Sequence, residues 1–246
     1  MSTAVSRSPG PLDTAVGRSA DLRRRTRWLA ALIMPIGPTA VAVLRFQLPY
    51  FTADGGADVA ASVIVDTGGQ SLVLWMGLVA IMTLVPGVLW VGRLTRRHHP
   101  RLTATAMLML VPGYLSLSWL IAQDILLWTG AREGIDAVAL GGMYETWHPT
   151  SVIAAGLFVL GHVIGTVILG IALWRSRTVP RVAAAMTAVS QPLHFIAAVV
   201  LVSPGLDLVA WGMNAVGFAA AAVAVVRLAD DDWDLPPVPR AASRVG

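Results

Sequence analysis

The sequence predicts an all-α polytopic membrane protein: a bundle of six transmembrane helices with both chain ends on the same side. Three observations support this. Of 246 residues, 56% are hydrophobic and 13% are charged, whereas a soluble domain has about 25% charged residues. Six long apolar segments divide the chain, and nearly all arginines lie on one side of the resulting topology. This composition excludes a soluble enzyme, a nucleic-acid-binding protein and a disordered chain.

Each of the six segments is long enough to cross a bilayer core, which needs about 20 apolar residues. In chain order they are 28–46, 71–92, 102–128, 151–174, 182–202 and 206–226. None shows the alternation of a membrane β-barrel strand, so we expect helices. The predicted organisation is a disordered basic N-terminal tail (1–27), a six-helix transmembrane domain (28–227) and a disordered C-terminal tail (228–246).

The individual segments carry further signals. The first follows a polar stretch without a small-residue cleavage site, so we expect a retained anchor and not a signal peptide. Arginine-rich loops separate the second segment from the third and the fourth from the fifth. Tryptophans near the segment ends are typical of an interfacial belt. Prolines within four segments predict kinks, at Pro35, Pro38, Pro86, Pro112 and Pro192.

Arginine placement predicts the orientation. All 18 basic residues are arginines, and with six crossings all but Arg45 and Arg132 lie on one side. The opposite side carries acidic residues such as Asp58 and Glu133. Loops rich in basic residues stay in the cytoplasm, so both termini are expected to be cytoplasmic.

Polar residues inside the last three segments indicate a pocket, because polar groups at membrane depth face the interior of a bundle. Segments 151–174, 182–202 and 206–226 each carry such residues at the spacing of one helix face. We expect the three faces to turn toward one another. The candidate substrate-binding residues on them are His162, Gln191, His194, Asp207, Trp211 and Asn214.

Two histidines of this set are predicted to lie at the same depth. His162 and His194 lie 12 and 13 residues from Trp174 and Arg181, which places both about 18 Å from the arginine side. One interpretation is hydrogen bonding between neighbouring helices. A second is axial ligation of haem by the two imidazoles. No metal ion is favoured, since zinc needs further ligands.

Asp124 is the one acid well inside an apolar segment. It is either an ordinary interfacial residue or part of the mouth of an outward polar cavity, with Arg45 and Asp207 nearby. In a partly dry site a carboxyl group or an imidazole can exchange protons with a substrate. The candidate catalytic residues are Asp124, Glu145 and His148.

Three functions remain open from these residues. The first is a non-catalytic, transporter-like, resistance or accessory protein for a small lipophilic or amphipathic molecule. The second is a membrane-embedded enzyme that acts on a lipid or isoprenoid by acid–base chemistry. The third is a haem protein that uses His162 and His194. Gly161 and Gly165, four residues apart, also permit close helix contact, within the bundle or in a homo-oligomer.

The C-terminal half resembles a known group of proteins. The loop 173–181 reads LWRSRTVPR, Gln191-Pro192-Leu193 follows in the next segment, and Asn214 lies midway along the last. These features resemble six-span bacterial integral membrane proteins of an uncharacterised family. The resemblance implies the fold and a membrane location, and it supplies no active site and no cofactor. The Lys-free, Arg-rich composition is typical of a high-GC bacterium, so we expect a multi-pass protein of its plasma membrane.

Overall fold

The computed structural model describes residues 21–51 and 54–235, and within these ranges the chain is helical and has no strand. Six stretches are long and apolar enough to cross a membrane, so this is an all-α, multi-pass membrane protein. The helices are α1 (Arg23–Ile33), α2 (Ile36–Gln47), α3 (Gly56–Val65), α4 (Thr67–Arg96), α5 (Pro100–Arg132), α6 (Ala137–Glu145), α7 (Pro149–Ser176), α8 (Arg181–Phe195), η1 (Ile196–Val200), α9 (Pro204–Arg227) and α10 (Asp230–Trp233).

Two of the six spans are made of two helices each. The first span consists of α1 and α2, which are separated at Pro35, a residue without the N–H that a continuous helix requires. The fifth span consists of α8 and the π-helix η1, and Pro192 lies one turn before the change. A π-helical turn is rare and is often found at functional sites.

The spans form a closed ring. Each of α2, α4, α5, α7 and α8 packs against the next span, and α9 closes the ring by packing against α2. Large apolar residues such as Trp75 and Leu108 are exposed on the outside, where a bilayer would cover them. The interior combines an apolar core with fully buried polar residues, as the polar helix faces predict.

Glycines bring α5 and α7 into close contact. A Cβ atom at Gly161 would lie 2.6 Å from the Met109 carbonyl oxygen, and one at Gly165 would lie 2.6 Å from the Leu110 side chain. Both glycines are buried. The pair therefore serves packing within the chain, which is one of the two roles expected for it, and the homo-oligomer stays a prediction.

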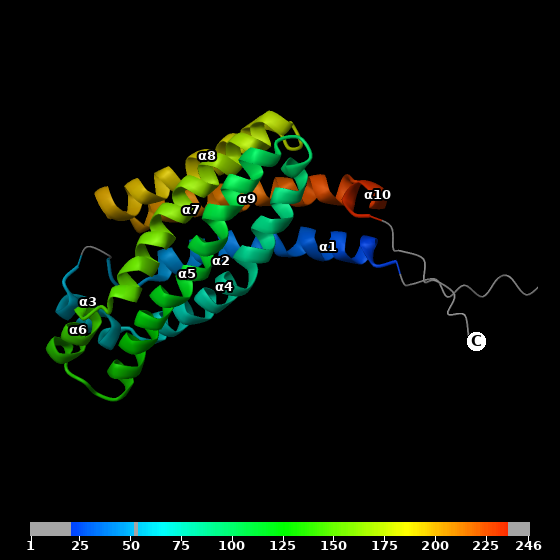
Figure 1. The fold of residues 1–246 in the computed structure, drawn as a ribbon. Helices are drawn as coiled ribbons and strands as arrows, with labels where there is room; N and C mark the ends of the chain where they lie inside the picture. Colours follow the sequence, from blue (N-terminus) through cyan, green and yellow to red (C-terminus); the bar gives the residue numbers. More distant parts are fainter. Residues whose placement is uncertain (1–20, 52–53, 236–246) are drawn as a thin grey trace, which may run out of the picture.

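Two short helices, α3 and α6, cover one end of the bundle (Figure 1). A Cβ atom at Gly141 in α6 would lie 2.5 Å from the backbone of Gly56, the first residue of α3, so the two helices meet backbone to backbone. The Gly56 N–H donates to Glu145 Oε1 at 2.6 Å. A small second core joins these helices to the bundle through Val59, Leu127 and Leu140.

The other end of the bundle holds both described chain ends (Figure 1). Trp233 of α10 is 2% exposed, stacks under the Arg93 guanidinium at 4.5 Å and donates from Nε1 to Thr26 Oγ1 at 3.2 Å. Asp234 pairs with Arg93 at 2.8 Å. The prediction of disordered tails is therefore wrong for residues 23–27, which belong to α1, and for 228–235, which fold against the bundle. Residues 1–20 and 236–246 lie outside the described residues.

Candidate functional site

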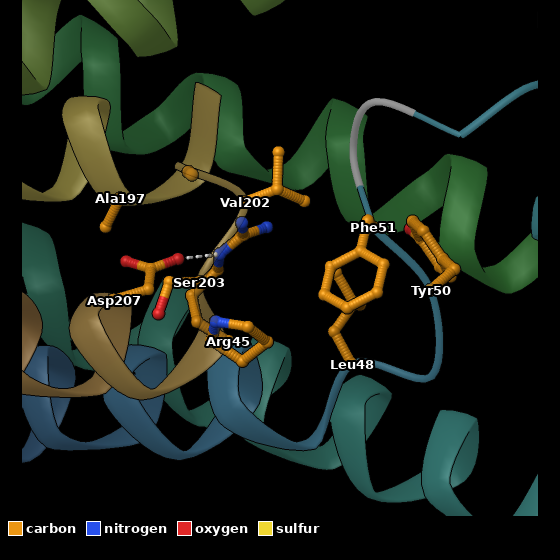
Figure 2. A pocket seen from close by; sticks show the side chains of 10 residues that line it. Arg45, Leu48, Tyr50, Phe51, Ala197, Val202, Ser203 and Asp207 are labelled. Atoms are coloured by element: carbon orange, nitrogen blue, oxygen red, sulfur yellow. Dashed lines mark hydrogen bonds and ion pairs between the residues drawn. The ribbon is translucent and has the colours of Figure 1, made fainter. Parts of the chain in front are cut away.

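A buried ionic network joins three spans. Arg45 Nε of α2 donates to Asp207 Oδ2 of α9 at 2.7 Å, and His194 Nδ1 of α8 donates to Asp207 Oδ1 at 2.5 Å. Figure 2 shows the Arg45 guanidinium beside the Asp207 carboxylate. Asp207 is 1% exposed. A carboxylate at this depth is tolerated because both of its oxygens accept hydrogen bonds, one from the Arg45 guanidinium and one from the His194 imidazole.

The chain geometry around this network is unusual. After η1 the backbone turns at Val202, whose φ of 49° lies in the left-handed region that β-branched residues rarely adopt. Ser203 then caps α9, where its side chain accepts from the Leu206 N–H at 3.4 Å. Val202 and Ser203 line a cavity of about 20 Å³ beside Arg45 and Asp207 (Figure 2). A cavity of this size holds about one water molecule.

Aromatic rings enclose the two histidines. The His162 and His194 ring centroids are 5.4 Å apart, which confirms the prediction that the two imidazoles lie level. Trp211 stacks on His162 at 5.9 Å and meets His194 edge-on at 5.4 Å. His162 Nδ1 donates to the Phe158 carbonyl oxygen, and the Phe158 ring stacks on the same imidazole.

This packing does not fit a bis-histidine haem. A porphyrin plane would have to pass between two imidazoles whose centroids are 5.4 Å apart, and Trp211 already packs against both rings. The haem interpretation is therefore not carried further. Among the described residues no group of three or more His, Asp or Glu side chains is arranged to hold a metal ion.

A cavity of about 330 Å³, within the range of small-molecule sites, lies next to the ionic network. Hollows of about 480 and 440 Å³ lie at the arginine-rich end, but polar side chains from several spans converge on the first, which is called the main cavity for that reason. Its wall is mostly apolar and comes from α2, α5, α7, α8, η1 and α9, together with the segment after α2 and the end of α6. A few polar side chains converge on it, as is usual where a ligand is oriented. They are Arg45, Tyr50, Gln123, Asp124, Tyr144 and His194.

Asp124 forms a second buried polar group on the cavity wall. Its Oδ1 accepts from the Tyr50 hydroxyl at 2.6 Å and from Gln70 Nε2 at 2.8 Å. Tyr50 lies in the segment after α2, and burial together with the Asp124 charge holds the pKa of its phenol well above the usual value. Tyr50 therefore stays neutral and donates a hydrogen bond to the carboxylate. Asp124 is 7% exposed and is not an ordinary interfacial residue.

A third polar group lies deeper in the bundle. Within the described part of the chain, no hydrogen-bond partner is found for polar side-chain atoms of Tyr114, Thr166, Gln191 and Asn214, nor for His162 Nε2 and Trp211 Nε1. All six side chains are at most 1% exposed. Buried polar atoms are nearly always hydrogen-bonded, and the Tyr114 hydroxyl lies near the side chains of Thr166 and Asn214, so contacts among these three and ordered water are the expected partners.

The structure brings together only part of the predicted site. Of the candidate binding residues, His194 and Trp211 line the main cavity and Asp207 lines the small one. His162, Gln191 and Asn214 are buried on the same inward faces but do not line a described cavity.

The predicted catalytic residues are dispersed. Asp124 lines the cavity, whereas Glu145 and His148 do not. Glu145 binds the Gly56 backbone, and His148 caps α7 by accepting from the Thr150 N–H at 3.3 Å. Tyr50 and Gln70, the two donors to Asp124, were not predicted from the sequence. Tyr50 lies outside the apolar segments and Gln70 lies at the edge of one, so helical periodicity carries no signal for either.

Comparison of this chain with known protein families, with curated proteins and with solved structures gives no match.

Proposed function

We propose that this protein binds a small amphipathic molecule in the main cavity and serves a transporter-like, resistance or accessory role without covalent chemistry. The observation that supports this is the cavity itself, which combines about 330 Å³ of space, apolar walls and a few converging polar groups. The dispersed positions of Glu145 and His148 favour binding over the acid–base enzyme, because Asp124 is the one predicted catalytic residue that lines this cavity.

The lipid-facing rim of the cavity supports an amphipathic ligand. Val159 of α7 and Val199 of η1 both line the cavity and are 38% and 57% exposed on the outside of the bundle. The cavity therefore reaches the lipid-facing surface between these two helices. A lipophilic molecule dissolved in the bilayer can enter here without crossing water, while its polar end meets Arg45, Asp124 or His194.

Filling the cavity should weaken ligand binding. Leu120 lines the cavity, and Leu120→Trp is expected to weaken binding of phenylbutanol, a small neutral amphiphile, at least tenfold because the indole occupies its volume. Binding is measured by tryptophan quenching and thermal stabilisation in nanodiscs, with empty nanodiscs subtracted. Leu115→Trp is the matched control, since Leu115 lies on the same helix and is 54% exposed. Equal binding by both variants and the wild type would refute the proposal.

We also propose a location in the plasma membrane of a bacterium with the arginine-rich end in the cytoplasm. The natural chain has no cysteine, so single-cysteine variants report one position each. A membrane-impermeant maleimide added to intact cells should label Glu133→Cys and leave His98→Cys unlabelled, since these exposed residues lie at opposite ends of the bundle. The reverse pattern would invert the orientation.

A further inference from the structure

We infer that the cavity selects a lipophilic cation and that Asp124 is its counter-ion, an inference that rests on the proposed binding function and narrows its ligand class. The starting observation is a carboxylate with a free oxygen. Asp124 Oδ1 accepts both hydrogen bonds, from Tyr50 and Gln70, and Oδ2 accepts none from the described residues. Both donors are neutral groups, so they do not balance the charge.

The other charged groups that line the cavity also leave the Asp124 charge unbalanced. Arg45 and Asp207 form an ion pair and cancel. Tyr50 and Tyr144 both lie outside the spans and remain neutral, because burial raises the pKa of each phenol. His194 hydrogen-bonds to Asp207 and not to Asp124, so among the described groups that line the cavity Asp124 is left without a cationic partner. A buried carboxylate is costly unless a cation pairs with it, and an entering ligand can supply that cation.

The apolar wall is suited to a cation as well. Aromatic rings of Tyr144, Trp147, Phe158 and Trp211 line the cavity together with Tyr50. The negative face of an aromatic ring attracts a cation, and organic ammonium groups are recognised in this way. A ligand with an apolar body and a cationic head would therefore find a favourable surface at both ends.

An anion would need Arg45, and this residue is a poorer anchor. Its charge is already balanced by Asp207, which binds Arg45 Nε at 2.7 Å. An anion bound beside Arg45 would share the cavity with Asp124, and the two like charges would repel each other in a medium of low dielectric constant. Anion binding is thus the main competing outcome of the test.

The test compares three probes of matched shape: phenylbutyl-trimethylammonium, its uncharged hydrocarbon isostere with a tert-butyl head, and phenylbutane sulfonate. Their dissociation constants are measured with the wild-type protein in nanodiscs of zwitterionic lipid. The cation should bind at least tenfold more tightly than the hydrocarbon, and the sulfonate more weakly than both. This part requires no variant and therefore does not depend on how a substitution folds.

The variant Asp124→Asn tests whether the Asp124 side chain causes the preference for the cation over the hydrocarbon. Asparagine keeps an oxygen that accepts from Tyr50 and Gln70 but has no charge, so cation binding should fall at least tenfold while hydrocarbon binding is retained. Asp58→Asn, an exposed acid in α3, is the control and should change neither. Equal affinity for cation and hydrocarbon, a preference for the sulfonate, or an unchanged preference in Asp124→Asn would overturn the inference and leave the binding function intact. Failure of all three probes and of phenylbutanol to bind would refute both.

Discussion

Replacement of Asp207 by alanine is expected to destabilise the protein by about 3 kcal/mol, the cost of leaving a buried charge without its partner. Asp207 is 1% exposed and joins Arg45 and His194, so its loss leaves both donors without an acceptor in the bundle. The three residues belong to α2, α8 and α9, so the network is one of the contacts that close the helix ring. The free energy of unfolding in detergent micelles, followed by circular dichroism, measures the effect.

Two further variants test whether the loss of stability in Asp207→Ala comes from the ionic network or from the removal of any acidic residue. Asp232→Ala removes an exposed acid for which no ion pair is found among the described residues, and it should leave stability unchanged. The double variant Arg45→Ala/Asp207→Ala removes both opposite charges, so its loss should be smaller than the sum of the two single losses. Strictly additive losses would show that Arg45 and Asp207 are not coupled.

The second large effect is expected at the contact between α5 and α7. Gly161→Ala should destabilise the protein by about 2 kcal/mol, because the added methyl group would lie 2.6 Å from the Met109 carbonyl oxygen and must push two backbones apart. Alanine otherwise favours a helix by about 1 kcal/mol over glycine, so the packing penalty must exceed this gain. Thermal unfolding in nanodiscs measures the net result.

Gly156 on the same helix is the matched control, since a Cβ atom there meets nothing within 4 Å. Gly156→Ala should be as stable as the wild type or slightly more stable. The two substitutions are chemically identical. Changes in stability of opposite sign would therefore be due to the contact of Gly161 with α5. Light scattering should give the same oligomeric mass for both variants; dissociation of an oligomer by Gly161→Ala alone would instead return this glycine to a subunit interface.

Much of the site could be predicted only in outline. Helical spacing placed His162, His194 and Trp211 on inward faces, and counting residues placed the two histidines at one depth; the ring contacts confirm both. The same reasoning treated Asp124 as either interfacial or part of a cavity mouth. The hydrogen bonds from Tyr50 and Gln70 decide between these two positions for Asp124. Both donors are far from Asp124 in the sequence, so helical spacing does not reveal the contacts.

Composition and periodicity by themselves determined the number of spans, their helical form and the inward position of the polar faces. The physical reason is that a bilayer demands long apolar helices and penalises polar groups that face lipid, so these properties are local. Only the tertiary structure decided that Arg45, His194 and Asp207 form one network, that α3, α6 and α10 are folded helices, and that Gly161 packs against α5. These depend on ring closure, which brings together residues far apart in the chain through the combined packing of all six spans.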